Sequence, residues 1–503
     1  MLAFDPWHDD MLGRKDEASA VLRFIHGRIE ERLKHSDPAS YVLNLNSQWG
    51  HGKTFFLERL RQDLQNGGAA VAFVNAWETD FSDDPMTAIM SAIDEALKPF
   101  LSRPTIRNAW KAAVRSGAPL VIGFSKKVGG KLLSKYAGDF ADDLFDAAFN
   151  DGAEKEAPKK PDDPLGVEKG VEEVVDKLAD SALERVMQGF RTQLRSVATF
   201  KSQLTKVAKS LQQNGKALRP IYVLVDELDR CRPLYAIRML EAVKHLFNAE
   251  GVVFIVGTDT EQLSQSVKAV YGASFDSDRY LYRFFDRTYR LRKPESAPFI
   301  KYLYAKNSID VQKLAYPHLV DLSIFTLRFF EDFDCSLRDI EQCFDMLHTV
   351  CTMWDKKAKI QLGYLLALII LYHFGRKKEY GILSGQVNAP FDSPIITTPS
   401  VILSHNVGSY NEPSRLVTGS TKTMIDAYKT ALARPLTEYV NGSTPKNPVD
   451  QWVFEQMREE FHILHSTLRR GMEGPFSVIR DYAGYLELAV RFETDEASEL
   501  ASQ

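Results

Sequence analysis

Two short stretches that lie far apart in the chain contain the residue types that hold phosphates and activate water. The first, WGHGKT (49–54), follows an apolar run and precedes a helical pattern. Glycines let backbone N–H groups wrap around phosphates, a lysine bridges the phosphate oxygens, and a following hydroxyl binds Mg²⁺. The usual pattern has a glycine where this chain has Ser47. We expect phosphate contacts from Ser47, Gln48, Trp49, Gly50, His51, Gly52, Lys53, Thr54 and Phe55, with Thr54 also on the metal.

The second stretch is IYVLVDE (221–227), an apolar run that ends in two carboxylates. A phosphate-loop enzyme needs an acid at such a strand end to hold Mg²⁺ and a neighbouring acid to polarise the attacking water. We assign Asp226 to the metal and Glu227 to the water, while Lys53 neutralises charge on the γ-phosphate. Alone, the first stretch could be a GKT sequence that occurs in a turn by chance, and the second could be a strand that ends in a solvated acid pair. Together, in this order, they predict binding and hydrolysis of a nucleoside triphosphate with Mg²⁺.

Other polar residues are single candidates for the same site. Thr258 or Asp259 follows the apolar run VVFIVG (252–257) and could sense the γ-phosphate, or could simply form a turn. Arg283 lies in YRFFDRTYR (282–290) with two further arginines. We expect Arg283 to reach a nucleotide bound by a neighbouring copy of the chain. A solvated charged stripe would look the same.

The elements that must position these residues alternate between strand and helix. Apolar runs predict strands, and helical spacing of apolar residues predicts the segments between them. Such alternation favours an α/β fold with a parallel sheet flanked by helices. The expected strands are 41–45, 69–77, 221–225 and 252–257, and the expected helices are 17–34, 54 onward, 85–100, 190–211 and 234–248. Residues 299–380 read as mostly helical, 384–420 as loop with short strands, and the tail as helical again.

Composition excludes several classes of protein. The chain has 503 residues, with 63 basic against 67 acidic, which argues against a globally basic nucleic-acid binder. The chain has only four cysteines, which is too few for a disulfide scaffold. Because no two of them form a CxxC pair, the sequence does not favour a structural zinc site. The start of the sequence does not resemble a secretory signal. The longest apolar run, 362–374, is shorter than the ~20 residues of a transmembrane helix. We therefore expect a cytoplasmic protein without a transmembrane span.

One segment breaks the globular pattern. Residues 101–136 contain eight basic residues and no acidic one, and 177–219 are again mostly basic. We interpret 101–186 as a charged insertion. It could contact nucleic acid or lie on an anionic membrane surface, peripheral to the inner membrane, or it could pack on its own chain as a solvated helical insertion. Its most apolar piece, 118–133, is interrupted by lysines and glycines and cannot cross a bilayer.

The string VDELDRCRP (225–233) resembles the signature of the KAP family of P-loop NTPases, which usually reads DDLDRC followed by a proline. Six further segments between residues 5 and 350 resemble family motifs: WGHGKT, DMLGRKDEA (10–18), VNAWETDFSDDP (74–85), FKSQL (200–204), YLYRFFD (280–286) and SLRDIEQ (336–342). The resemblance implies an ATP-driven switch, ATP rather than GTP, and a nucleotide contact in cis from Arg338 in the helical lid. Phage exclusion has been linked to some members, which implies bacterial anti-phage defence. Glu227 stands where many members have a second aspartate, and the longer side chain favours hydrolysis.

These observations predict a core at 1–295, a helical lid at 296–355 and a mainly helical C-terminal domain at 356–503. The expected partners are ATP and ADP, further copies of the chain, and a protein effector or sensor. Two other readings stay open. One is a nucleotide-gated interaction scaffold with negligible turnover. The other is a nucleic-acid-stimulated motor, motivated by the basic segments.

Overall fold

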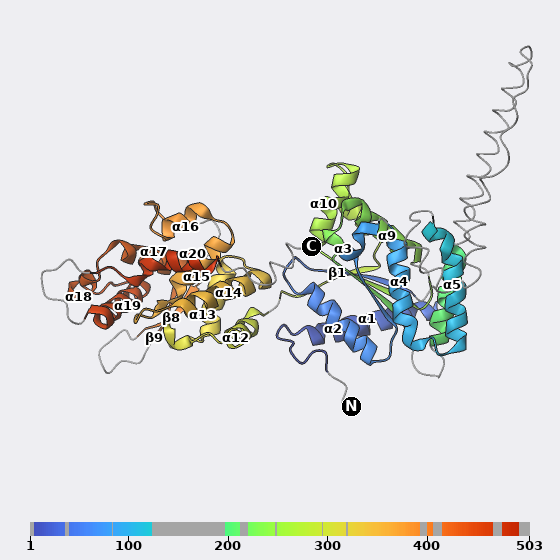
Figure 1. Cartoon of the computed structure of the whole chain (residues 1–503), viewed down its shortest axis with the longest axis horizontal. Helices are drawn as coiled ribbons and strands as arrows, with labels where there is room; N and C mark the ends of the chain where they lie inside the picture. The colour runs from blue at the N-terminus through green and yellow to red at the C-terminus, as the bar shows by residue number, and fades with distance from the viewer. Residues whose placement is uncertain are drawn as a thin grey trace, which may run out of the picture. The chain divides into compact units, whose positions relative to one another are not determined.

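The chain divides into two compact units. The computed structural model describes residues 5–35, 40–82, 84–122, 197–211, 220–246, 249–293, 295–317, 320–392, 400–405, 415–465 and 475–491. The first unit contains Met1–Asp9 and Arg14–Arg292, and the second contains Asp10–Gly13 and Lys293–Gln503 (Figure 1). The chain therefore passes between the units three times, after Asp9, after Gly13 and after Arg292.

The first unit is built on a five-stranded sheet in the order β2-β3-β4-β1-β5, with every neighbouring pair parallel. The predicted α/β class with a parallel sheet flanked by helices is confirmed. The phosphate-loop candidate follows β1, an inner strand next to the central strand β4, and the acid pair follows β3, on the other side of β4. The strands are β1 Tyr41–Asn46, β2 Val71–Asn75, β3 Ile221–Asp226, β4 Val252–Thr258 and β5 Arg287–Arg290.

Alternate residues of each central strand face two different hydrophobic cores, because successive side chains in a strand point to opposite faces. In β1, Tyr41 and Leu43 pack with α1 and α2, while Val42 packs with α4, α5 and α9. Burial on both faces explains why the strands read as continuous apolar runs. The helices are α1 Arg14–Lys34, α2 Lys53–Asn66, α3 Ala76–Thr79, α4 Pro85–Leu97, α5 Pro104–Ile122, an unlabelled helix over 197–211, α9 Pro233–Leu246, α10 Thr260–Tyr271 and α11 Ser277–Leu281.

The end of one expected strand is wrong for a local reason, and one expected helical segment changes its type before it ends. The strand expected over 69–77 ends at Asn75, because the Asn75 side chain accepts hydrogen bonds from the N–H groups of Trp77 and Glu78 and starts α3. The helix expected over 85–100 ends at Leu97 and continues as a 3₁₀ turn, Lys98–Phe100. Of the charged insertion, α5 covers the start, and 123–186 lies outside the described residues.

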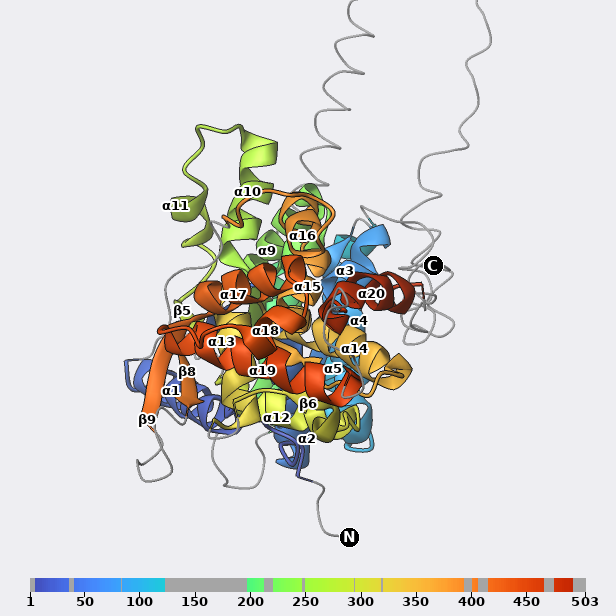
Figure 2. The ribbon, with the colours of Figure 1, turned by 90° about the vertical axis from the view of Figure 1, so that its left-hand side faces the viewer.

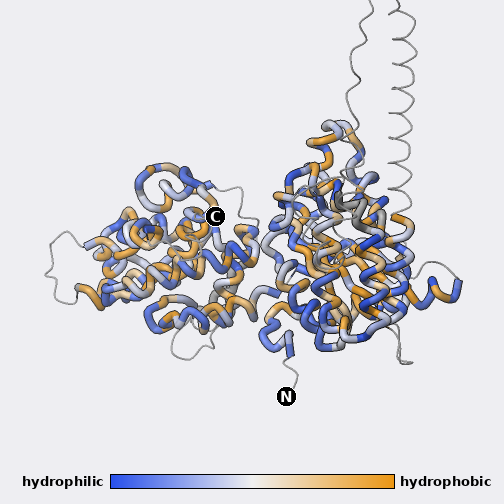
Figure 3. The backbone as a smooth tube through the Cα atoms, turned by 45° about the vertical axis from the view of Figure 1, so that its right-hand side comes forward, coloured by the Kyte–Doolittle hydropathy of each residue, from blue (hydrophilic) through white to orange (hydrophobic). Residues whose placement is uncertain are grey.

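The second unit is mainly helical and has one hydrophobic core, which runs from Ile300 to Ala489. Residues of the expected lid and of the expected C-terminal domain share this core. Helices α17 and α19, both labelled in Figure 2, contact one another. Figure 3 shows apolar segments running through each unit. The helices are α12 Ser296–Lys306, α13 Leu322–Asp332, α14 Leu337–Met353, α15 Leu362–His373, α16 Lys377–Leu383, α17 Thr421–Ala433, α18 Thr437–Asn441, α19 Pro448–His465 and α20 Tyr482–Ala489. The short strands are β6 Leu314–Ala315 with β7 Ile360–Gln361, and β8 Ser400–His405 with β9 Arg415–Ser420.

The longest apolar run forms α15, in which every residue from Leu362 to Leu371 is buried. Its interpretation as a core helix is confirmed. Within the part of the chain that the structure describes, no helix is long and apolar enough to cross a membrane.

Asp332, at the end of α13, is a fully buried carboxylate that should cost the second unit stability. Neither of its oxygens has a hydrogen-bond partner of ordinary geometry among the described residues, and burial raises its pKa to about 6, which the nearby Thr421 hydroxyl offsets only in part. A carboxyl whose pKa is raised in the folded protein binds its proton more tightly there than in the unfolded chain. The protonated carboxyl therefore stabilises the native state at pH 4, and this contribution is lost as the pH rises through 6. Asp332→Asn should therefore raise the free energy of unfolding at pH 7 by about 2 kcal/mol, and by little at pH 4.

Denaturant unfolding of both proteins at the two pH values measures this difference. Asp321→Asn, at the other end of α13, is the matched control. Its side chain caps the helix and hydrogen bonds lower its pKa, so its loss should destabilise the protein. An Asp332→Asn protein that is less stable at pH 7 would contradict the prediction.

Candidate functional site

The turn between β1 and α2 has the backbone of a phosphate-binding loop. Gly50 and Gly52 have φ values of 74° and 84°, in the left-handed region that residues with a Cβ rarely adopt. Ser47, at the position of the usual first glycine, is buried, and its N–H donates to the carbonyl of Thr258 at 3.1 Å. The first turn of α2 therefore presents its N–H groups and the positive end of its dipole at this loop.

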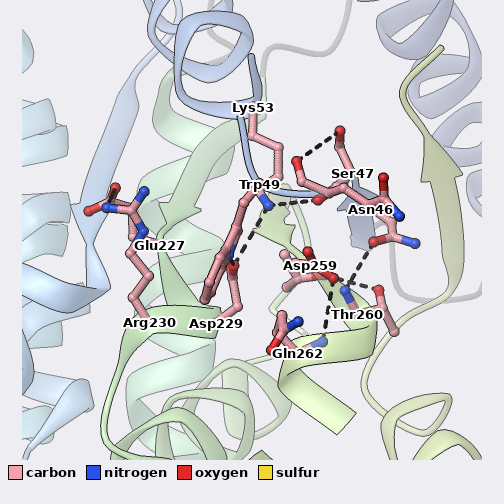
Figure 4. Close-up of polar contacts among 12 residues, drawn as sticks. Asn46, Ser47, Trp49, Lys53, Glu227, Asp229, Arg230, Asp259, Thr260 and Gln262 are labelled. Carbon is pink, nitrogen blue, oxygen red and sulfur yellow. Dashed lines mark hydrogen bonds and ion pairs between the residues drawn. The ribbon is translucent and has the colours of Figure 1, made fainter. Parts of the chain in front are cut away.

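Lys53 is buried in the turn and is held by its own loop and by a carboxylate. Its ammonium donates to the carbonyl of Ser47 at 2.7 Å and lies 3.7 Å from a carboxylate oxygen of Asp229 (Figure 4). Burial lowers the pKa of Lys53, and the charges of Asp229, Asp259 and Asp226 act in the opposite direction. Lys53 therefore lies beside the Asp229 carboxylate and within the field of two further carboxylates, Asp259 and Asp226.

Asp226 and Thr54 fit the two protein groups that an Mg²⁺ ion bound to phosphates requires. Burial raises the pKa of Asp226, and hydrogen bonding by the Thr54 hydroxyl lowers it. Oδ2 of Asp226 is buried without a hydrogen-bond partner among the described residues, so it is available to a cation or its water. A Cβ at Gly257 would lie 2.8 Å from Leu57 and 3.2 Å from Asp226, so glycine lets β4 approach both.

No cluster of three or more His, Cys, Asp or Glu side chains in the described ranges could hold a metal by itself.

Asp229 is a member of this site that the sequence reasoning did not single out. Its side chain is 2% exposed, Oδ2 accepts a hydrogen bond from the indole N–H of Trp49, and Oδ1 is buried without a partner among the described residues. The signal was present, since Asp229 is the second aspartate of VDELDRCRP. Trp49 therefore contacts the loop that follows β3, while much of its ring stays exposed.

Glu227 has a strained backbone and a paired carboxylate. Its φ is 57°, which is uncommon for a residue with a side chain, and Oε1 lies 2.9 Å from the Arg230 guanidinium. Arg230 in turn lies over the ring of Trp77, 5.9 Å from its centroid, and Trp77 is half-exposed (Figure 4 labels Glu227 and Arg230). The side chain predicted to polarise water is thus engaged by a cation.

The polar residues at the ends of β1 and β4 hold one another. Thr258 donates to Asn44 Oδ1 at 2.7 Å, and the N–H of Thr260 donates to Asn46 Oδ1 at 3.0 Å. Asp259 is the N-cap of α10 and accepts from the N–H of Gln262 at 3.4 Å. The turn-forming alternative accounts for these contacts of Asp259, and its charge also acts on Lys53. Asn44 and Asn46 were missed because an asparagine in a strand pattern carries no specific signal.

The structure does not bring every predicted residue to the loop's inner side. The ring of Phe55 packs edge-on against Trp7 with centroids 6.4 Å apart. Gln48 is exposed, and so is Arg283, which lies between α11 and β5. Arg338 is exposed on α14, in the second unit. The roles predicted for these four residues, like those of the other site residues, stay predictions.

A comparison with protein families gives the decisive match. The model of the KAP family P-loop domain matches residues 25–351, which is more than half of the chain. The chain belongs to the KAP family. A comparison with curated proteins finds no match. KAP membership agrees with the parallel sheet and with a phosphate loop after its inner strand β1, and it assigns residues 25–351 to a class of nucleotide-binding domains.

Asp229 should compete with nucleotide for Lys53 in this KAP domain. Its carboxylate occupies the position of a counter-ion to the ammonium, and a phosphate must displace that interaction. Asp229→Asn keeps an acceptor for Trp49 and removes the charge. Because ATP then no longer has to displace the ion pair between Asp229 and Lys53, ATP binding should become about tenfold tighter.

Calorimetric titration with ATP and Mg²⁺ measures this change. Glu78→Gln, which removes an exposed carboxylate of α3, controls for the general loss of negative charge and should change affinity little. Weaker binding by Asp229→Asn would mean that the carboxylate assists nucleotide binding instead.

Proposed function

We propose that the first unit binds ATP with Mg²⁺ and hydrolyses it, and that turnover rearranges the lid at 296–355 and the C-terminal region at 356–503. One observation carries this proposal. Lys53, Thr54 and Asp226 meet at the end of the central strands, and Asp226 keeps one buried oxygen without a partner among the described residues. On the family resemblance alone, we assign the switch to bacterial anti-phage defence.

The chain's own residues have distinct roles in this proposal. The turned-in N–H groups of 47–54 and the Lys53 ammonium hold and neutralise the phosphates, while Thr54 and Asp226 hold Mg²⁺. The metal supplies further neutralisation of the charge that develops on the phosphates. Glu227 orients the attacking water and accepts its proton, which requires its carboxylate to leave Arg230. Exposed Arg283 suits a contact with a nucleotide in a second copy, and Arg338 suits a contact from the lid.

The test is phosphate release by the full chain with ATP, measured with Mg²⁺, with excess chelator, and after Mg²⁺ is restored. Turnover that requires Mg²⁺ and recovers with it supports the proposal. Light scattering with and without ATP reports whether a second copy is recruited. Absence of ATP binding at millimolar ATP and Mg²⁺ would overturn the proposal.

A second function, a nucleotide-gated scaffold with negligible turnover, is favoured by one specific observation. Glu227 is ion-paired with Arg230 at 2.9 Å in this structure, so the carboxylate is not free to polarise water. In that case ATP binds tightly and changes the partners of the chain, while phosphate release stays at background. Measuring ATP binding and turnover on the same preparation separates the two functions.

A further inference from the structure

Arg14, the first residue of α1, is completely buried and reaches two distant segments of the first unit. One terminal nitrogen, Nη2, donates to the carbonyl of His51 in the phosphate loop at 2.8 Å. The other, Nη1, donates to Glu17 and to the carbonyl of Arg292 at 3.1 Å. A single guanidinium therefore joins the phosphate loop to the residue that ends the first unit.

Glu17 completes the arrangement from the next turn of α1. It is 4% exposed, and its Oε1 accepts hydrogen bonds from the Tyr289 hydroxyl and from the N–H of Arg292, each at 3.0 Å. The Arg14–Glu17 pair thus holds both the N–H and the carbonyl of Arg292. Arg14 directly follows Gly13, where the chain enters the first unit. The Arg14–Glu17 pair therefore lies next to two of the three points at which the chain changes unit, after Gly13 and after Arg292.

The contact at His51 acts on a group that would meet phosphate. In a planar trans peptide the carbonyl and the next N–H point in opposite directions. Because Arg14 holds the carbonyl of His51, it directs the N–H of Gly52 to the opposite side. A phosphate that attracts this N–H turns the same peptide plane, and the turn is transmitted to the Arg14 hydrogen bond.

We infer that Arg14 and Glu17 are positioning residues that couple the state of the phosphate loop to the path of the chain into the second unit. This inference rests on the proposed function, since it needs a nucleotide at the loop. Stability alone is a poor reason for the pair, because buried ion pairs contribute little net stability compared with apolar residues. A guanidinium with two terminal nitrogens suits the role because it binds both carbonyls at once.

Arg14→Lys is the diagnostic variant, since an ammonium can still neutralise Glu17 but lacks the planar fork that spans His51 and Arg292. Arg32→Lys is the matched control. Arg32 lies at the other end of α1 and joins Asp286 and the carbonyl of Ser40, which are neither in the phosphate loop nor at a passage between the units. Arg14→Met with Glu17→Leu, which removes both charges, serves if Arg14→Lys does not fold.

The experiment measures ATP affinity by calorimetry and the distance between the units by paired spin labels on the full chain. The labels occupy cysteines introduced at exposed Glu30 and Lys378, with partly exposed Cys335 replaced by alanine. ATP with Mg²⁺ should shift the distance distribution in the unmodified protein and in Arg32→Lys. In Arg14→Lys, affinity should fall about tenfold, the value of one charged hydrogen bond, and the shift should be lost even at saturating ATP.

The outcomes separate the two proposals. If the unmodified protein binds ATP but shows no shift, or if Arg14→Lys shows the full shift, the coupling inference is overturned, while the proposed binding and hydrolysis of ATP stand. If the unmodified protein does not bind ATP, the proposed function is overturned and the coupling fails with it.

Discussion

Replacing Glu227 with glutamine should lower ATP turnover about 10³-fold and leave ATP bound, because the amide keeps the size of the side chain but cannot accept a proton from water. Lys53, Thr54 and Asp226, which hold the phosphates and the metal in our proposal, are untouched. The amide also loses its charge interaction with Arg230, so the side chain becomes freer without becoming a base. Single-turnover phosphate release and ATP retention on the protein measure the two effects.

Glu250→Gln is the matched control, since Glu250 pairs with Lys209 at 2.8 Å on an exposed part of the same unit. It should leave turnover unchanged. Turnover in Glu227→Gln close to that of the unmodified protein would remove Glu227 from the mechanism. Equal, negligible turnover in both proteins, with tight ATP binding, would establish the scaffold instead.

Replacing Lys53 with alanine should weaken ATP binding by about 10² and turnover by at least about 10³. The ammonium is the cation buried in the phosphate loop, and Asp226, Asp229 and Asp259 would then face the phosphates without it. Like charges in a partly buried site repel more strongly than at the surface. Calorimetry with ATP and Mg²⁺, followed by turnover at saturating ATP, separates the loss in binding from the loss in chemistry.

Lys209→Ala, at an exposed lysine, controls for the loss of one positive charge. A Kd for ATP within about a factor of two of the unmodified value in Lys53→Ala would show that ATP binds elsewhere. Thermal unfolding without nucleotide should show a lower midpoint in Lys53→Ala, because the buried carboxylate of Asp229 loses its cation and keeps only the hydrogen bond from Trp49.

Much of the first unit could be predicted from sequence because its signals are local. Val223 and Leu224 lie within a continuous apolar run, which reports burial on both faces of a sheet. The glycines of WGHGKT report a backbone that needs positive φ, and the structure places Gly50 and Gly52 there. The fold class and the family follow from these patterns, and both are confirmed.

The contacts that could not be predicted from the sequence join segments that lie far apart in the chain and come together only in the folded protein. Asp229 and Trp49 are 180 positions apart, and Arg14 lies 278 positions from Arg292, so no local pattern pairs them. In the second unit, the spacing of apolar residues predicts which face of each helix is buried, but it does not predict which other helix that face packs against. For that reason we predicted a lid at 296–355 separate from a C-terminal domain at 356–503. In the structure, residues of both ranges share one hydrophobic core. The roles assigned to Arg283 and Arg338 stay predictions.

The strand order has a consequence for how this chain emerges from the ribosome. β1 ends at Asn46, yet its neighbours β4 and β5 begin only at Val252 and Arg287, and β2 must wait for β3 at Ile221. At synthesis rates of about 5–20 residues per second, the apolar strand β1 waits roughly 10–40 s for its first partner. The described strands of the first 220 residues cannot pair with one another, so nascent chains of this length should be strong clients of ribosome-associated chaperones. Ribosome-bound nascent chains halted before and after β4 should differ sharply in protease resistance.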